Sequence, residues 1–169
     1  MKKFLLLTAI LLMCFGQIKA QDMSSVDFRL RDVDGNEFSF QKYLSQVQTV
    51  GEKGAIIISF WAMWCEPCKQ EMKALVPLFE KYKDRNLHYL AVNLDNPRSL
   101  AKVKAYVKAQ KLPYDFLLDP NSEVFKKLNG QSMPYSLILD REGKLIAKRT
   151  GYIAGDENEI EVDIKKILE

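Results

Sequence analysis

Histidine and cysteine are scarce in this sequence, which has one His and three Cys among 169 residues. A structural zinc site normally takes four ligands from such side chains. Cys65 and Cys68 could therefore supply at most half of one, and His88, at the start of a predicted strand, is better explained as a structural residue. We expect neither a metal nor a cofactor.

Repeats, low-complexity stretches and Pro/Gly-rich linkers are also absent, so nothing divides the chain into separate domains. An excess of basic charge is absent after residue 20. Residues 1–20 contain three lysines and no acid, which leaves 22 basic and 22 acidic side chains in the remainder. A neutral domain gives no indication of a nucleic-acid surface or a basic membrane patch. We expect one domain, residues 21–169, and no nucleic-acid partner.

The first 20 residues have the order of a secretory signal peptide. Met1-Lys2-Lys3 is followed by the apolar run Phe4–Phe15 and by the small residue Ala20, after which we expect cleavage. The apolar run is shorter than the roughly 20 residues that span a bilayer, which favours a cleaved leader over an uncleaved anchor. Cys14 follows Met13 instead of the small residue usual before a lipidated cysteine, so it should leave with the leader. We expect the mature protein in the periplasm, with a membrane-anchored form facing the periplasm as the alternative.

Strand and turn signals come first in the mature chain. Val26–Arg31 and Glu37–Phe40 flank the turn dipeptide Asp34-Gly35, which predicts an opening hairpin. A loop then leads to Ala55–Trp61, a continuous β-branched and aromatic run typical of a central strand buried on both faces. This strand delivers the chain directly to Cys65.

Helical spacing begins at the cysteines. Apolar residues recur every three to four positions in Cys68–Tyr82, so we expect an amphipathic helix that Pro77 bends. The other expected elements are a strand over 87–94, a helix over 99–110, a strand over 114–119, a short helix over 121–128 capped by Asn121, an antiparallel hairpin of 134–140 and 144–150, and a packing helix over 156–168. Alternating strands and helices indicate an α/β fold with a largely parallel core.

Cys65 and Cys68 form a CXXC motif at the predicted start of a helix. Cysteines at i and i+3 there can bring their Cα atoms within the roughly 4.4–6.8 Å that a disulfide needs, so dithiol and disulfide are both accessible. Cys65 lies at the positive end of the helix dipole, which favours its thiolate, and is predicted to be the nucleophile. Cys68, one turn in and less exposed, is predicted to be the resolving cysteine. A Cys65–Cys68 bridge closes a short loop that adds little stability, which argues against a purely structural role.

Three neighbours affect the chemistry of this pair. Pro67 fits the first turn of the helix, where no N–H needs a partner, and stiffens the motif. Glu66 places a negative charge beside the attacking thiol, which we take as an argument for a reductant over a strong oxidant. Glu71 lies three residues beyond Cys68, on the same side of the helix. If it is buried with a raised pKa, Glu71 could relay the proton of Cys68; as a solvated helix residue it would have no role, and the residues alone leave both interpretations open.

The segment Trp61–Glu71, WAMWCEPCKQE, resembles the active site of the thioredoxin superfamily, in its exported TlpA/ResA-type branch. The resemblance extends over about residues 26–168 and includes the Asp34-Gly35 hairpin, an inserted helix-strand unit and Met133-Pro134. It implies a thioredoxin-like fold, with a central mixed sheet flanked by helices, an N-terminal β-hairpin and the inserted helix-strand unit.

The resemblance also implies functional residues and partners. Met133 and Pro134, joined by a cis bond, would face the cysteines and bind substrate together with Trp64 and Pro67, and Glu71 would act near the site. Proteins of this type typically receive electrons from a membrane thiol carrier and reduce cytochrome c apoprotein or other exported proteins. We therefore expect a protein-disulfide reductase whose substrates are exported thiol/disulfide proteins.

Two positions depart from the family pattern. Ser59 stands where cytoplasmic thioredoxins have a buried aspartate that assists proton transfer, so this chain lacks that group or uses Glu71 in its place. Pro77 falls about one turn later than the helix proline usual in the family, which bears on where the helix bends.

Two other functions remain open. A redoxin-type peroxidase would share the fold but would need a Thr- or Ser-assisted cysteine pocket, whereas Cys65 is preceded by Met63-Trp64. A non-enzymatic exported binding domain would keep Cys65 and Cys68 as a static disulfide. We interpret Trp61 as a core residue and Trp64 as a surface residue beside Cys65.

Overall fold

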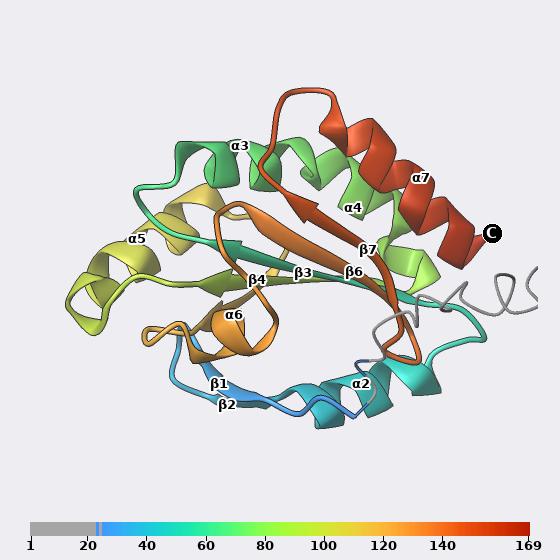
Figure 1. Ribbon diagram of the computed structural model, residues 1–169, viewed down its shortest axis with the longest axis horizontal. Coiled ribbons are helices and arrows are strands. Elements are labelled where there is room, and N and C mark those ends of the chain that lie inside the picture. Colours follow the sequence, from blue (N-terminus) through green and yellow to red (C-terminus); the bar gives the residue numbers. More distant parts are fainter. Residues whose placement is uncertain (1–22, 24) are drawn as a thin grey trace, which may run out of the picture.

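A computed structural model describes residue 23 and residues 25–169. The predicted signal peptide, residues 1–20, and Cys14 within it lie outside the described residues. The described chain folds around one seven-stranded sheet with helices on both faces (Figure 1). This is the expected thioredoxin-like α/β architecture.

The sheet is mixed. Its strands in chain order are β1 (Arg29–Asp32), β2 (Glu37–Ser39), β3 (Ala55–Trp61), β4 (Leu87–Asn93), β5 (Asp115–Leu118), β6 (Tyr135–Asp140) and β7 (Leu145–Thr150). They lie side by side in the order β2-β1-β5-β4-β3-β6-β7. The pairs β3–β4 and β4–β5 are parallel, and the other four pairs are antiparallel. β3 is therefore an inner strand, with β4 on one side and β6 on the other.

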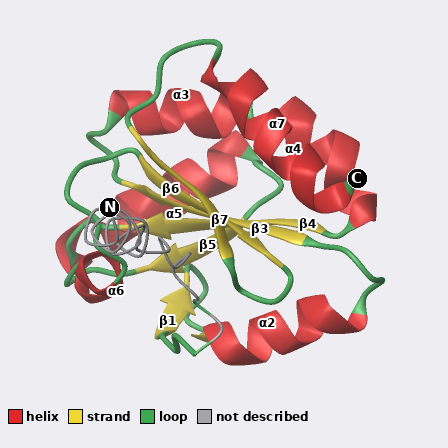
Figure 2. Cartoon of the chain, turned by 45° about the vertical axis from the view of Figure 1, so that its right-hand side comes forward, coloured by secondary structure: helices red, strands yellow, loops and turns green. Residues whose placement is uncertain are grey.

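Helices cover the sheet in two layers. In chain order they are α2 (Phe40–Thr49), α3 (Glu66–Ala74), α4 (Val76–Tyr82), α5 (Leu100–Gln110), α6 (Glu123–Lys127) and α7 (Asp156–Leu168). Figures 1 and 2 show α3, α4 and α7 on one side of the sheet and α2 on the other. None of the helices in the described part of the chain is both long enough and apolar enough to cross a membrane.

Strand β3 contributes to a core on each of its faces, because all seven of its residues are buried. Successive side chains of a strand point to opposite faces. Ile57 and Trp61 pack in the cluster beneath α3, α4, α5 and α7, whereas Ile58 and Phe60 pack in the cluster beneath α2 and α6. Ser59 has the same parity as Ile57 and Trp61. Its hydroxyl therefore faces the layer that carries the cysteines.

Most of the predicted elements are confirmed. β3 and α7 have the predicted bounds, both hairpins form, and α5 with β5 makes the inserted unit, which pairs with the N-terminal hairpin through β1 and β5. The helix expected over residues 68–82 is divided into α3 and α4 at Leu75. Pro77 lies in the first turn of α4 and has no N–H to continue the backbone hydrogen bonds of α3. The helix therefore breaks at the place where a bend is expected.

Two details of the sequence-based assignment are wrong. It has a loop where α2 forms, although Phe40, Leu44 and Val47 recur at helical spacing and are buried. It also names Asn121 as the cap of α6. The side chain that caps this helix is Asp119, whose carboxylate accepts hydrogen bonds from the N–H groups of Glu123 and Phe125, both at 2.9 Å. Asp119 is buried and follows the last residue of β5, four residues before α6 begins.

Candidate active site: a disulfide at a helix start

The cysteine pair lies where β3 ends and α3 begins. β3 ends at Trp61, and after three connecting residues Cys65 is the N-cap of α3. The Cys65 N–H donates a 3.0 Å hydrogen bond to the carbonyl of Ala62, which turns the chain from the sheet into the helix. The central strand and the first turn of α3 thus fix the position of the motif, as the sequence predicts.

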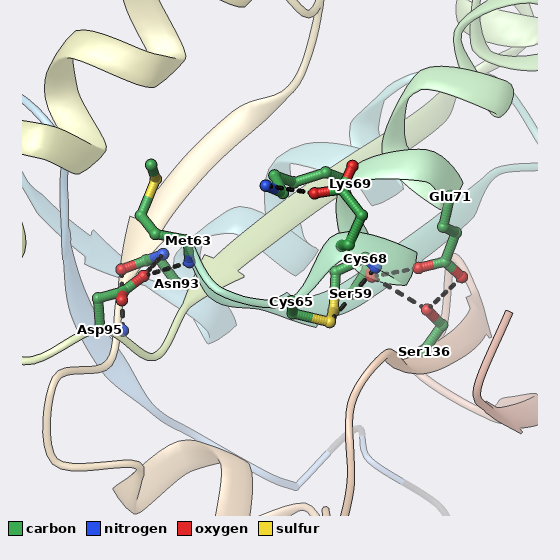
Figure 3. The surroundings of a disulfide bond; sticks show 10 residues. Ser59, Met63, Cys65, Cys68, Lys69, Glu71, Asn93, Asp95 and Ser136 are labelled. Carbon is green, nitrogen blue, oxygen red and sulfur yellow. Dashed lines mark hydrogen bonds and ion pairs between the residues drawn. A yellow bond between two sulfur atoms is a disulfide. The ribbon is translucent and has the colours of Figure 1, made fainter.

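Cys65 and Cys68 form a disulfide with their Cα atoms 5.4 Å apart (Figure 3). The Cys65 sulfur also accepts a hydrogen bond from the Cys68 N–H at 3.3 Å, so it lies at the unpaired N–H groups of the helix start. Cys68 is wholly buried and Cys65 is 4% exposed. The expected order of exposure holds, but in this oxidised state the sulfur proposed to attack is itself nearly buried.

The residues between the cysteines are exposed. Pro67 occupies the first turn of α3, as predicted. Glu66 pairs with Lys69, with 2.6 Å between Oε2 and Nζ. The hydrogen bond with Lys69, followed by the charge of Lys69, lowers the pKa of Glu66 below its ordinary value. The negative charge beside Cys65 is therefore partly neutralised by a neighbour, which weakens the sequence argument that Glu66 opposes thiolate formation.

Glu71 lies one turn beyond Cys68 on α3 and is 1% exposed. Its carboxyl group contacts two hydroxyls from the sheet. Ser59 Oγ donates to Oε2 at 3.0 Å, and Ser136 Oγ lies 3.0 Å from Oε1. Ser59 on β3 and Ser136 on β6 are directly paired across the sheet, and in Figure 3 both converge on the carboxyl group. The carboxyl group of Glu71 therefore contacts Ser59, which is the position at which cytoplasmic thioredoxins have a buried aspartate.

Burial is the main cause of the raised pKa of Glu71. Desolvation raises the pKa of Glu71 to about 7, and hydrogen bonds from Ser136 and Ser59 offset part of this effect. The charge of Asp156 raises the pKa further, and that of Arg149 lowers it. Both conditions set for a proton relay, burial and a raised pKa, are met. An acid with a pKa near neutrality can accept and return a proton at ordinary pH.

The remaining predicted site residues lie at the surface or just beneath it. Trp64 is 74% exposed, whereas Trp61 is fully buried, as interpreted from the sequence. The Met133-Pro134 bond is cis, as the resemblance implies. Met133 is half-buried and packs against the cluster that contains both cysteines. Their roles in substrate binding stay predictions.

His88 lies away from the cysteines. It pairs with Ile56 near the first residue of β3, whereas Cys65 follows the last. Its ring nitrogens contact the hydroxyl of Tyr43 at 2.9 Å and the side-chain oxygen of Asn86 at 2.7 Å. The interpretation of His88 as a structural residue agrees with these contacts. Across residues 23 and 25–169, no three or more His, Cys, Asp or Glu side chains gather as metal ligands would.

The sequence does not predict three residues that lie near the motif in the structure. Ser136 reaches Glu71 from β6. Asn93 and Asp95 lie at the end of β4, and Asp95 accepts a 2.7 Å hydrogen bond from the N–H of Met63. Asn93 and Asp95 carried one usable signal, because polar residues that follow a buried parallel strand lie at the same edge of the sheet as the end of β3. The sequence contains no such signal for Ser136, because its pairing with Ser59 depends on how β6 aligns with β3 in the folded sheet.

Comparison with known proteins identifies the family. The model of the AhpC/TSA family matches residues 23–160. Thioredoxin-like protein YneN of Bacillus subtilis (strain 168) is 34% identical over 94 residues, which cover 55% of this chain and 50% of that protein. Thiol-disulfide oxidoreductase ResA of Bacillus thuringiensis subsp. konkukian (strain 97-27) is 26% identical over 141 residues, which cover 83% of this chain and 75% of that protein. The matched segments thus span half of the first relative and three quarters of the second.

A solved structure supports the fold independently. The crystal structure of a candidate thiol:disulfide interchange protein DsbE from Chlorobium tepidum superposes with a TM-score of 0.73 at 24% sequence identity. The superposition covers 85% of this chain and 94% of that chain. The resemblance stated from the active-site segment is therefore confirmed at the level of family and fold.

Proposed function

The chain belongs to the AhpC/TSA family, and we propose that it is an exported thiol-disulfide oxidoreductase that reduces disulfide bonds in other exported proteins. The observation that carries the proposal is the Cys65–Cys68 disulfide at the N-terminus of α3, with the buried carboxyl group of Glu71 one turn further on. The name of the ResA relative agrees with this chemistry.

Reduction of a substrate begins at Cys65 of the dithiol form. Its thiolate, stabilised by the N–H groups of the helix start, attacks one sulfur of the substrate disulfide. A bond forms between Cys65 and that sulfur, the substrate S–S bond breaks, and the second substrate sulfur leaves as a thiolate and takes up a proton. The product of this step is a mixed disulfide.

Cys68 completes the reaction. Its thiol gives a proton to the Glu71 carboxylate and its sulfur attacks Cys65, which re-forms the Cys65–Cys68 bridge and releases the first substrate sulfur as a thiolate. Glu71 then gives up the proton, and the substrate thiolate is protonated to the thiol. Two electrons have then passed from the dithiol to the substrate. A dithiol donor must reduce the bridge before the next cycle, and we assign this role to a membrane thiol carrier.

Export rests on the first 20 residues, whose lysine pair, apolar run and Ala20 have the order of a signal peptide. Export places the mature protein, residues 21–169, in the periplasm, where disulfides form and persist and a reductant has substrates. Cytochrome c apoprotein, which the resemblance names among the substrates of such proteins, is the first substrate to test.

Trapping of the mixed disulfide tests the proposal. A Cys68→Ser form expressed in its native compartment should accumulate exported thiol proteins bound to Cys65, because the resolving sulfur is missing. A Cys65→Ser form is the matched control and should retain none of these adducts. An absence of adducts on Cys65, together with no insulin reduction by the unmodified protein, would refute the proposal.

Two further measurements separate the alternatives. A peroxide-consumption assay should give no activity, whereas a redoxin-type peroxidase would consume peroxide through its cysteine. Equilibration with glutathione buffers of defined potential should interconvert the dithiol and disulfide forms, and a static bridge would resist this exchange.

A further inference from the structure

The segment between β3 and α3 is short and must place Cys65 accurately. Residues 62–64 connect the last residue of β3 to the N-cap of α3. At one end, the Leu94 N–H donates a 2.9 Å hydrogen bond to the Trp61 carbonyl and extends the pairing of β3 with β4. At the other end, the Cys65 N–H bonds to Ala62. The backbone N–H of Met63, in the middle of the segment, needs a separate partner.

Asp95 supplies that partner. Its Oδ2 accepts a 2.7 Å hydrogen bond from the Met63 N–H and a 2.8 Å hydrogen bond from the Asn93 side-chain amide (Figure 3). The Asp95 N–H donates back to Asn93 Oδ1 at 3.1 Å. Asn93 is the last residue of β4, is 2% exposed and accepts a 2.8 Å hydrogen bond from the Asp119 N–H through its carbonyl. The carboxylate is thus oriented by a buried residue that is itself anchored in the sheet.

We propose that Asp95 is a positioning residue for the redox centre, which holds the Met63 backbone so that the Cys65 sulfur stays at the N–H groups of the α3 start. This inference rests on the proposed function. Hydrogen bonds to an ionised acceptor are roughly twice as strong as neutral ones, which suits a single contact that fixes a short segment. A displacement of the segment would move Cys65 away from the Cys68 N–H, its present donor.

The charge and the position of Asp95 act on Cys65 in opposite directions. A negative charge near a thiol opposes its ionisation, so loss of the charge alone should make Cys65 ionise more easily. Loss of the hydrogen bond should loosen residues 62–64 and let the Cys65 sulfur move away from the N–H groups at the start of α3. Cys65 should then ionise less easily. Two substitutions separate these effects. Asp95→Asn keeps an acceptor oxygen without the charge, and Asp95→Ala removes both.

The experiment labels Cys65 of the reduced protein with iodoacetamide across a range of pH and identifies the labelled cysteine by mass spectrometry. We expect Asp95→Ala to lower the labelling rate of Cys65 at neutral pH about fivefold, as loss of one hydrogen bond implies, and to raise the pH midpoint. We expect Asp95→Asn to leave the rate within about twofold and the midpoint unchanged or lower. A lower midpoint in both variants would overturn the proposal, because loss of the charge would then be the whole effect.

Asp140→Ala is the matched control. The Asp140 carboxylate accepts hydrogen bonds from the N–H groups of Glu142 at 3.0 Å and Lys144 at 2.9 Å. Asp140 pairs with Ala55 and so lies at the opposite end of β3, about 20 Å from the motif. Its loss should reduce stability and leave the labelling of Cys65 unchanged. Equal effects of Asp95→Ala and Asp140→Ala on labelling would mean that Asp95 has only a structural role.

Hydrogen exchange of the Met63 amide decides the question if Asp95→Ala does not fold. In the unmodified protein this amide should exchange far more slowly than that of Trp64, which lies beside it at the surface. Exchange of Met63 at the rate of an unstructured peptide would overturn the proposal. Failure of the proposed function would look different, because Cys65 of the unmodified protein would then label no faster than an ordinary cysteine.

Discussion

Ser59 and Ser136 face each other across β3 and β6, and their hydroxyl oxygens lie 3.0 Å apart beside the carboxyl group of Glu71. Each hydroxyl also lies 3.0 Å from one carboxyl oxygen, so three contacts join three groups. With Glu71 ionised, both hydroxyls can donate to it. With Glu71 protonated, each group donates once and accepts once around a closed ring. The same geometry can therefore hold either protonation state, which is what a proton relay requires.

The first prediction concerns the cost of burying Glu71. Its pKa is raised from an ordinary 4.5 to about 7 in the folded protein, chiefly by desolvation. The folded state then binds more protons than the unfolded state between these values, so the contribution of Glu71 to stability is highest below about pH 4.5 and is lost as pH rises through 7. Glu71→Gln should remove this dependence and raise the free energy of unfolding by about 3 kcal/mol at about pH 8, with little gain at about pH 4.

Denaturant unfolding of the oxidised protein at these two pH values measures the effect. Glu80→Gln is the matched control, because Glu80 is an exposed residue of α4 paired with Lys83. That substitution should change stability by less than about 1 kcal/mol at either pH. A gain for Glu71→Gln that is equal at both pH values would show that the carboxyl group does not titrate between them.

The second prediction concerns the resolving step. If Glu71 accepts the proton of Cys68, Glu71→Gln should slow release of a peptide from its mixed disulfide with Cys65 by about 100-fold near neutral pH. The unmodified protein should show a rate that rises with pH through the pKa of Glu71, and the variant should lose this inflection. Rapid-quench kinetics with a fluorescent peptide disulfide follow the step directly. Equal release rates in both proteins would exclude Glu71 from the transfer.

The sequence predicts the parts of this site that are local in the chain. The CXXC pair, Pro67 in the first turn and Glu71 one turn beyond all follow from helical spacing around Cys65. β3 is predicted to the residue, because an inner strand buried on both faces is a nearly continuous apolar run, which only Ser59 interrupts here. Burial of Glu71 is not predictable in this way, since a helix of this composition is compatible with either a solvated or a buried carboxylate.

The parts that come from other strands escape prediction for a physical reason. Ser136 reaches Glu71 only because β6 pairs with β3 in one register, and a shift of one residue would turn its hydroxyl to the other face. Asp95 likewise meets Met63 only because β4 lies beside β3. Pairing across the sheet is set by tertiary packing, which no single segment encodes.

The third prediction contrasts the two tryptophans beside the motif. Trp61 is fully buried and packs against the rings of Tyr106 and Phe116, so Trp61→Ala should lower the free energy of unfolding by about 3–5 kcal/mol. Trp64 is 74% exposed, so Trp64→Ala should change stability by less than about 0.5 kcal/mol. Its effect should appear in function instead, as a roughly tenfold slower capture of a folded substrate, because exposed aromatics anchor interfaces.

Capture of a small disulfide such as oxidised glutathione is the internal control for Trp64→Ala. It should proceed at the unmodified rate, since a small molecule needs no extended docking surface. Equal slowing of both substrates would mean that Trp64 affects Cys65 itself and not the docking of a partner.

The fourth prediction concerns His88, whose hydrogen bonds depend on its charge. Asn86 Nδ2 donates to the carbonyls of Val50 and Lys53, which turns its oxygen toward His88 Nε2 and fixes the proton there. The Tyr43 hydroxyl lies 2.9 Å from His88 Nδ1 and 3.1 Å from Asp115 Oδ2, so its one proton is shared between these two acceptors while His88 is neutral. Desolvation lowers the pKa of His88 below its ordinary 6.5, and the charge of Asp115 offsets part of this effect.

The lowered pKa makes the unfolded state bind more protons than the folded state below about pH 6.5, so His88 should reduce stability as pH falls through that range. Glu71 titrates in an overlapping range with the opposite sign, so the measurement belongs in the Glu71→Gln variant. There, the free energy of unfolding should fall on acidification past about pH 6.5, and adding His88→Gln should abolish that fall.

Asp115→Asn should lower the pKa of His88 further in an NMR titration, because it removes the one charge that favours the protonated ring. A rise in that pKa would contradict the proposed balance of burial against charge.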